Sequence, residues 1–455
     1  MNKRVRWGLM IGFVLILGFS AQLQAQERLS LDEALSIALE NNPSVKKAEA
    51  QVEIARSALR LVENNTFSPD IAVSQSIALT KEFASGFSFT MKDSYSFGDS
   101  VEEEKARLNV ESSERALREA REVVKQSVIS VYLNILKGER SIELAEKNLE
   151  LLRKRYEKVQ VQFAEGNAAA FAVREAEKNL QDAEGVLSNL RENIAVLKKK
   201  LNGILGRELE TDFAVAPLPE VNFPEVSLES FKSVALQNRN ELRDILSQRE
   251  SVELDQKSLR EEKQPSVKLL GEYSAEEWSV SVAVEPLKKN LEWEVKRSLA
   301  QAGSPVLVGE SGESFGAGLV VSWVLASGMW KEKEKQNELK LAQIEADYQA
   351  QADSIATEVE EKYYRFKKTE GDLQIRRTTI AVEREKYALR EKQYQMGAID
   401  EETLLAGAIA MMQAESDYES NVYDAILSWV DLRRSTGEEI VIGELFQAES
   451  KEVGE

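Results

Sequence analysis

The sequence predicts a mainly α-helical chain with transmembrane β-strands and an internal duplication. Three observations lead to this fold class. Apolar residues recur every 3.5 positions along two long segments, as in coiled coils. Shorter segments alternate apolar residues with Ser, Thr and Ala, as in strands that have one polar face. Both patterns occur twice, in the same order.

The composition of the 455-residue chain excludes several classes of site. The chain has no Cys and no His, which rules out disulfides, Cys/His zinc sites, iron–sulfur clusters and a Ser-His-Asp triad. Its net charge of −19 argues against nucleic acid as the main partner, because phosphate contacts need clustered Lys and Arg. We therefore expect no metal, no cofactor and no nucleic-acid partner.

The N-terminus has the layout of a secretory signal peptide. Residues 1–25 begin with three basic residues, continue with an apolar run over 7–19, and end in small and polar residues. We predict cleavage after Ala25. An uncleaved membrane anchor is the alternative, which the short length of the apolar run disfavours.

The duplication is visible in landmarks that recur in order. The segments 30–41 and 227–238 share six residues at an offset of 197, and each begins with a Ser that is suited to cap a helix. Pro69 and Pro265 then break the helical pattern, and Gly166 and Gly397 interrupt long helical runs. We predict a first structural repeat over 26–205, a linker over 206–225, a second repeat over 226–437 and a C-terminal tail over 438–455.

Long helices are predicted on both sides of each glycine. One runs from about 101 to 165 and another from about 330 to 396, and each is followed by a second helix after its glycine. In the seam from Val128 to Phe163, every member is apolar except Gly138. The 3.5-residue period indicates left-handed packing, and the glycine breaks make each pair antiparallel.

Strand hairpins are predicted at about 69–98 and about 265–326. The strands 71–79 and 87–97 form the first hairpin, and the strands 267–273 and 315–325 form the second. We interpret 284–314, which is rich in Gly and Pro, as a long extracellular loop with a short amphipathic piece near 291–299. Four strands cannot close a barrel, and open strand edges cannot face lipid, so several chains must share one barrel.

This ordered set of features resembles the TolC-type outer-membrane efflux channel family. The resemblance covers essentially all of 28–440 and includes the closing segment 414–437. It implies a homotrimer that combines an α-barrel in the periplasm with a shared 12-stranded β-barrel in the outer membrane, to which each chain contributes four strands. It also implies contact with outer-membrane lipid and docking to a periplasmic adaptor protein and an inner-membrane transporter. The expected function is that of the exit duct of a tripartite efflux or type I secretion system.

Three consecutive acids after the second glycine are the candidate periplasmic entrance. The family's aperture acid would fall near Thr403 and Ala406, which are not acidic, but Asp400, Glu401 and Glu402 lie one turn earlier. In a trimer they would supply nine carboxylates, which would attract cations and raise one another's pKa. The alternative is an ordinary acidic helix start, which the helix dipole stabilises.

The two glycine turns are the candidate adaptor-docking tips. The resemblance implies docking at Glu165, Gly166, Asn167, Met396, Gly397, Ala398 and Ile399. The alternative is that these residues only reverse the chain between two helices.

Two other functional classes are weighed against the channel. A soluble periplasmic coiled-coil chaperone or adaptor would share the helices, but the lumen-like polar faces of the strands disfavour it. A carboxylate enzyme such as a glycosidase is disfavoured because the acids lie on solvated helix faces. We therefore predict that the chain is not an enzyme.

Overall fold

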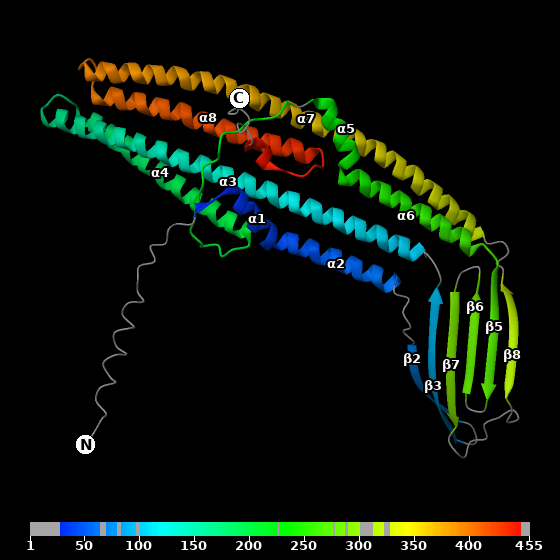
Figure 1. Cartoon of the computed structure of the whole chain (residues 1–455). Coiled ribbons are helices and arrows are strands. Elements are labelled where there is room, and N and C mark those ends of the chain that lie inside the picture. The colour runs from blue at the N-terminus through cyan, green and yellow to red at the C-terminus, as the bar shows by residue number, and fades with distance from the viewer. Residues whose placement is uncertain are drawn as a thin grey trace, which may run out of the picture.

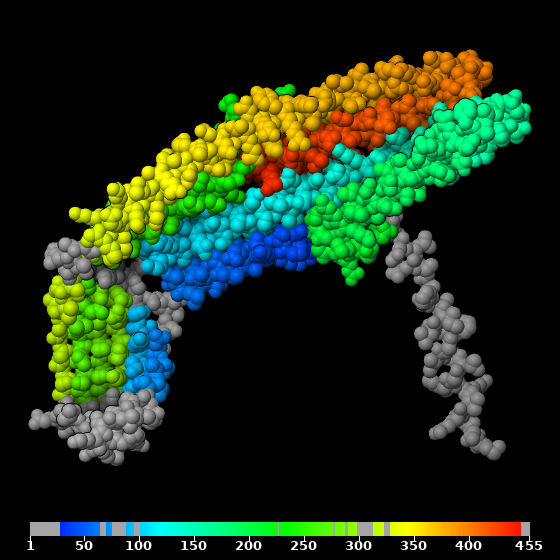
Figure 2. Space-filling model, turned by 180° about the vertical axis from the view of Figure 1, so that it is seen from behind, coloured from blue at the N-terminus to red at the C-terminus, as the bar shows by residue number. Residues whose placement is uncertain are grey.

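A computed structural model describes residues 28–63, 70–79, 83–96, 101–225, 227–275, 278–286, 290–300, 313–322 and 328–446. The predicted signal peptide, Pro69 and the last nine residues of the predicted tail lie outside these described residues. Within them, helices form one long curved arm, and a β-sheet hangs from one end of it (Figure 1). The space-filling view shows the same sheet from behind as a separate plate below the arm (Figure 2).

The helices of the arm come in two sets of four. The first set is α1 (Leu31–Asn41), α2 (Pro43–Glu63), α3 (Val101–Ala164) and α4 (Ala170–Leu205). The second set is α5 (Leu228–Asn238), α6 (Asn240–Glu262), α7 (Gly328–Gln395) and α8 (Glu401–Ser435), and the 3-10 helix η1 (Ile442–Phe446) follows it. The long helices α3 and α7 run the length of the arm, and α4 and α8 return along them from the far tip (Figure 1).

Capping residues determine where the short helices begin. The Ser30 hydroxyl accepts a hydrogen bond from the Glu33 amide at 3.2 Å, and the Glu33 carboxylate accepts one from the Ser30 amide at 2.9 Å. This reciprocal capping box satisfies two amides that the helix itself leaves unpaired. Ser227 caps α5 in the second set by accepting from the Ser230 amide at 3.3 Å. These are the two serines of the sequence repeat.

The duplication extends to single hydrogen bonds. Asn42 Nδ2 donates to the Ile204 carbonyl at 2.8 Å, where α4 ends beside the α1–α2 elbow. Arg239 Nη1 donates to the Ser435 carbonyl at 3.2 Å, where α8 ends beside the α5–α6 elbow. The donors are 197 residues apart (239 − 42) and the acceptors 231 (435 − 204), which are the two offsets of the sequence repeat.

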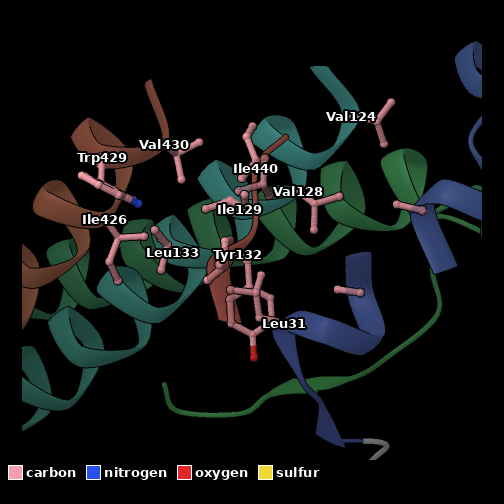
Figure 3. Close-up of a cluster of buried hydrophobic side chains, with 14 of the residues drawn as sticks. Leu31, Val124, Val128, Ile129, Tyr132, Leu133, Ile426, Trp429, Val430 and Ile440 are labelled. Atoms are coloured by element: carbon pink, nitrogen blue, oxygen red, sulfur yellow. The ribbon is translucent and has the colours of Figure 1, made fainter. Parts of the chain in front are cut away.

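The main hydrophobic core lies midway along the arm, where both sets of helices meet. Tyr132 of α3 is completely buried there, among apolar residues of α1, α3 and α8 (Figure 3). The short parallel strands β1 (Arg28–Leu29) and β4 (Ala214–Val215) close the core from one side. Because β4 belongs to the segment between the two sets, this segment is part of the core.

The sheet contains six antiparallel strands in the order β2-β3-β7-β6-β5-β8. They are β2 (Asp70–Leu79), β3 (Phe83–Ser96), β5 (Ser266–Ala275), β6 (Trp278–Glu285), β7 (Asn290–Ala300) and β8 (Ser314–Ser322). The mainly helical fold class with a sheet is confirmed, and β2–β3 and β5–β8 pair as the two predicted hairpins do. The prediction of four strands is wrong, because β6 and β7 form a further hairpin between them.

A physical reason can be given for the second strand of the extra hairpin only. The first strand, β6, alternates Trp278, Val280 and Val282 with Ser279 and Ser281, which is the same pattern as in the first predicted hairpin. The second strand, β7, alternates Leu291, Trp293 and Val295 with charged residues. A charged polar face together with nearby Pro and Gly suggested a loop that contains an amphipathic piece. In the structure, Pro286 forms only the turn after β6.

The register gives the sheet one apolar and one polar face, because residues directly opposite each other on paired strands point to the same side. Among the described side chains, the apolar face carries Ile71, Val73, Phe89, Met91, Val267, Leu269, Tyr273, Trp278, Val280, Val282, Val284, Leu291, Trp293, Val295, Phe315, Leu319 and Val321. Two charged residues share this face, Asp93 and Arg297, and the Arg297 guanidinium lies over the Trp278 ring at 5.0 Å. Leu270 and Val320 are apolar exceptions on the other face. The polar face carries Asp70, Ser74, Ser88, Thr90, Lys92, Ser94, Ser266, Lys268, Glu272, Ser274, Ser279, Ser281, Glu285, Asn290, Glu292, Glu294, Lys296 and Ser314.

Within the described residues, no helix combines the length and the apolar character that crossing a bilayer requires.

Candidate functional site

Both tips of the arm are closed by the same turn. Gly166 follows α3 with a φ of 78°, and Gly397 follows α7 with a φ of 71°. The Asn167 amide donates to the Gln162 carbonyl at 2.7 Å, and the Ala398 amide donates to the Gln393 carbonyl at 2.8 Å. These bonds define a Schellman turn, which ends a helix at a residue in the left-handed conformation. Glycine is needed at both places for that reason.

Apolar side chains are exposed around these turns. Met396 is 74% exposed and Phe171, in the first turn of α4, is 69% exposed. Phe163, which the seam pattern placed in the packed interface, is 47% exposed. Two helix reversals therefore present apolar groups to the surroundings at the far end of the arm. Such groups are suited to contact another protein.

The first of the three candidate entrance acids caps a helix. Asp400 Oδ1 accepts hydrogen bonds from the Thr403 amide at 2.9 Å and from the Thr403 hydroxyl at 2.6 Å, which fixes the start of α8. The bonds to Thr403, and a further one to Lys158, lower the pKa of Asp400 to about 2. The contacts of Asp400 with Thr403 are therefore those of an ordinary acidic residue that caps a helix.

All three acids also pair with basic residues of α3. Lys154 Nζ lies 2.7 Å from a carboxylate oxygen of Glu401, and Arg155 Nε lies 2.6 Å from one of Glu402. Lys158 Nζ lies 3.3 Å from Asp400 and 3.2 Å from Glu402. Three acids and three bases therefore form one charge-balanced cluster that joins the start of α8 to the last third of α3.

Within one chain, the pKa values of Asp400 and Glu402 are lowered. Burial raises the pKa of Glu402, but the bonds from Arg155 and Lys158 outweigh it and the pKa is lowered. The hydrogen bond to Glu402 raises the pKa of Lys158. Carboxylates that only faced one another would show raised values. Within one chain, the neighbouring cations decide the outcome.

Sequence analysis missed these three bases. They lie within five residues on α3, shortly before Gly166, whereas the acids come directly after Gly397. The signal becomes readable only when α3 and α8 are known to be neighbours, because their separation along the chain is about 245 residues, as for the pair Lys158–Glu402 (402 − 158 = 244).

Further ion pairs join α3 and α8 between this cluster and the central core. Arg140 of α3 lies 3.3 Å from a carboxylate oxygen of Glu415 and 3.5 Å from one of Glu419. Lys137 lies 2.5 Å from Asp424. The antiparallel pairs α3–α4 and α7–α8 instead bury apolar residues such as Leu187, Ile194 and Ile380. Between the tip and the central core, ion pairs thus join one coiled coil to the other, whereas apolar seams hold each coiled coil together. Midway along the arm, the shared apolar core joins the two sets of helices.

The polar face of the sheet carries charges at the end nearest the helices. Lys268 Nζ lies 3.3 Å from Glu285 and 2.7 Å from Glu292, so one cation joins β5, β6 and β7. Lys92 of β3 and Glu294 of β7 are paired in the register. Among the described residues, no group of three or more acids is placed to hold a metal ion.

Comparison with known proteins identifies the family. The model of the outer membrane efflux protein family matches residues 34–207 and 232–438, which is most of the chain. The chain belongs to the outer membrane efflux protein family. No curated protein matches it.

Solved structures share the fold at low sequence identity. The CmeC outer membrane channel of Campylobacter jejuni has a TM-score of 0.65 and 16% identity over 90% of this chain and 85% of its own. The outer membrane protein VceC of Vibrio cholerae has a TM-score of 0.64 and 14% identity over 90% of this chain and 96% of its own. The MtrE outer membrane channel of Neisseria gonorrhoeae, in its open state, has a TM-score of 0.56 and 16% identity over 90% of this chain and 89% of its own.

Family membership confirms the channel interpretation of the sequence. This outer membrane efflux protein is a channel and not an enzyme, and it is located in the outer membrane with its helices in the periplasm. Proteins of the family act in tripartite efflux systems with an adaptor and an inner-membrane transporter. The match leaves out 208–231, which contains most of the predicted linker.

Proposed function

We propose that three copies of this chain assemble into one passive conduit, the exit duct of a tripartite efflux or type I secretion system. One observation carries the proposal: a sheet with an apolar and a polar face, and an open edge on each side, stands at the end of a long helical arm. The apolar face suits outer-membrane lipid and the polar face a watery lumen. Energy comes from the partner transporter, so the duct itself needs no cofactor.

The two open edges are the reason for assembly. A sheet edge in lipid would leave backbone N–H and C=O groups without partners, which costs several kcal/mol for each group. Copies that join edge to edge around a rotation axis form a closed ring and satisfy every edge. The proposed domain layout is a signal peptide over 1–25, repeats over 26–205 and 226–437 joined by 206–225, and a tail over 438–455.

The tips of the arm are the proposed docking site for the periplasmic adaptor. Two rigid Schellman turns present exposed apolar groups, with Met396 the most exposed. The docking residues proposed are Glu165, Gly166, Asn167, Met396, Gly397, Ala398 and Ile399.

The cluster at the start of α8 is the proposed periplasmic entrance. Asp400, Glu401 and Glu402 are paired with α3 in the state described, so this state carries little net charge at the cluster. Separation of α8 from α3 would free nine carboxylates in a trimer. The entrance therefore attracts cations when it widens. Its selectivity follows from the width of the opening and from the electric field of the freed carboxylates.

The test is the mass and the conductance of the protein purified from outer membranes. Light scattering corrected for detergent gives the number of copies, and planar bilayers give the conductance. We expect three copies and a small, mostly closed, cation-preferring conductance that rises in the variant D400N/E401Q/E402Q. A monomer that is soluble without detergent would overturn the proposal and favour a periplasmic coiled-coil protein.

A further inference from the structure

The strand count of the sheet sets the width of the outer-membrane pore. Resting on the trimer proposed above, we infer that this protein forms an eighteen-stranded barrel (3 × 6), in which the hairpin β6–β7 of every copy is part of the wall. The partner at each sheet edge is a second copy of this chain, and β2 of one copy pairs with β8 of the next. The twelve strands implied by resemblance are four per chain, without this hairpin.

The hairpin β6–β7 is integrated in the sheet on both sides. β7 pairs with β3 over eleven residue pairs, from Gly86↔Ala300 to Ser96↔Asn290. β6 pairs with β5 over seven, from Leu269↔Val284 to Ala275↔Trp278. β5 is thereby separated from β3 by two complete strands. Removal of the hairpin would bring β3 and β5 together, and these two strands run in opposite directions as antiparallel neighbours must.

The side chains of the hairpin fit a barrel wall. Trp278, Val280 and Val282 of β6 lie on the apolar face of the sheet. Glu292 and Glu294 of β7 lie on the polar face, the second opposite Lys92 of β3. A hairpin lying outside the barrel would have no reason to continue both faces in register. Its eight and eleven residues also suit tilted strands that cross a bilayer.

The two edges suit each other as neighbours. β2 runs away from the helices and β8 runs back toward them, so a copy placed edge to edge continues the antiparallel alternation (Figure 1). β2 has ten residues and β8 nine. Both present exposed apolar side chains on the same face of the sheet, among them Val73 at 71% and Leu319 at 62% exposure.

Closure of a single chain on itself is not a competing solution. Six strands are fewer than the eight of the smallest outer-membrane barrels. Two copies would give twelve strands, so the number of copies decides the width. Barrel diameter grows roughly linearly with strand number, which makes eighteen strands about half again as wide as twelve, with about twice the cross-section.

The first test uses the absence of Cys, because any disulfide must then join introduced cysteines, and the mass on a non-reducing gel separates a bond within one chain from a bond between copies. Met91 and Val295 are opposite in the register, and so are Thr90 and Lys296 on the other face. One of these two pairs is the closer, non-hydrogen-bonded type, so one of the variants M91C/V295C and T90C/K296C should form a disulfide within the chain. V73C/V295C is the control and should form none within a chain, because β3 lies between these positions.

The outcomes separate this inference from the function proposed above. A disulfide between β3 and β7 together with a trimeric mass supports eighteen strands. A trimeric mass without either β3–β7 disulfide leaves the trimer intact and overturns the wide barrel. The disulfide together with a dimeric mass supports the hairpin but gives twelve strands, so both the wide barrel and the trimer are overturned.

A second variant measures the width itself. Deletion of 278–300 removes β6 and β7 and joins β5 to β8 through the residues that remain between them. We expect a variant that still inserts as a trimer and whose barrel, in electron-microscopic views along the axis, is about a third narrower. An unchanged diameter would contradict the inference. Should the variant fail to insert, the disulfide pairs in the full chain decide the matter.

Discussion

Gly206 lies directly against the backbone of Asn41, so that a Cβ at this glycine would be 2.7 Å from the Asn41 carbonyl oxygen. The same relationship recurs in the second set of helices, where a Cβ at Gly437 would be 3.0 Å from the Asn238 carbonyl oxygen. Both glycines have a positive φ, 68° and 71°. The returning helices α4 and α8 are therefore each followed by a glycine that packs against the backbone of the elbow. Any residue with a side chain would clash there.

Substitution of this glycine should destabilise the protein. Gly206→Ala combines a left-handed backbone with a clash against backbone, and we expect a loss of about 1–3 kcal/mol of unfolding free energy. Gly185→Ala is the matched control, because Gly185 lies exposed within α4 with no atom near its Cβ position. It should stabilise by up to about 1 kcal/mol. Chemical denaturation in detergent, followed by circular dichroism, measures both, and equal effects would contradict the account.

A second glycine sets the distance between α3 and α4. A Cβ at Gly138 would be 2.8 Å from Cγ1 of Ile194. Gly138→Leu should therefore cost about 1–3 kcal/mol through overpacking. Adding Ile194→Ala should recover part of that loss, although Ile194→Ala alone costs about 2–4 kcal/mol. Additive effects in this double-mutant cycle would show that the two residues do not share the space.

The buried Tyr132 should make stability depend on alkaline pH. Its hydroxyl lies 2.7 Å from the Ala216 carbonyl oxygen and 2.9 Å from that of Leu29. Burial raises its pKa from 10.0 to about 12. Stability from the neutral hydroxyl is thus complete below pH 10 and is lost as the pH rises toward 12, at about 1.4 kcal/mol for each pKa unit.

Tyr132→Phe tests this dependence. At pH 7 the variant should be less stable by about 1 kcal/mol, because it loses a hydrogen bond while the Ala216 amide keeps the Leu29 carbonyl as acceptor. The difference in stability between the two proteins should shrink between pH 10 and 12. In this range Tyr132 ionises in the unfolded wild type before it does in the folded protein, and the variant has no hydroxyl at this position. Thermal melts across this range check it, and parallel curves would refute it. Tyr423, whose burial also raises its pKa to about 12, is present in both proteins.

The ion pairs at the start of α8 should control the proposed entrance. Arg155→Glu places an acid against Glu402 and should raise the conductance in planar bilayers severalfold at low salt, because like charges push α8 from α3. The effect should weaken above about 0.1 M salt, where screening shortens the reach of exposed charges.

Two further variants identify the interaction. Glu402→Arg added to Arg155→Glu should restore the closed state by reversing the pair. Arg153→Glu is the control, since Arg153 pairs with Glu184 of α4, within the same coiled coil, at 3.4 Å. A rise in conductance with the control as large as with Arg155→Glu would assign the effect to net charge alone.

Much of the fold could be predicted because its signals are local or periodic. The helix starts at Ser30 and Ser227 and the turns at Gly166 and Gly397 depend on neighbouring residues only. The strand β7 was harder to recognise, because Glu292, Glu294 and Lys296 give it a fully charged polar face that resembles a solvated helix. β6 has a Ser-rich polar face and was readable from the sequence. The exception in the seam, Gly138, becomes meaningful only once Ile194 is seen to occupy the free space.

The candidate site was predictable only in part. The acids at 400–402 were found because they are consecutive, but their partners Lys154, Arg155 and Lys158 lie on a helix that precedes them by about 245 residues, a distance that no local pattern spans. The direction of the pKa shifts depends on these partners. The lowered carboxylate pKa values within one chain therefore cannot be read from the acids alone.

The near-equal lengths of α3 and α7 fix the distance between the outer membrane and the partner at the tips of the arm. With 64 and 68 residues, the two helices span about 96 Å and 102 Å. Shortening α3 alone by one heptad would leave its glycine turn about 10 Å short of the other. The length of the arm can therefore change only if α3, α4, α7 and α8 are lengthened or shortened together.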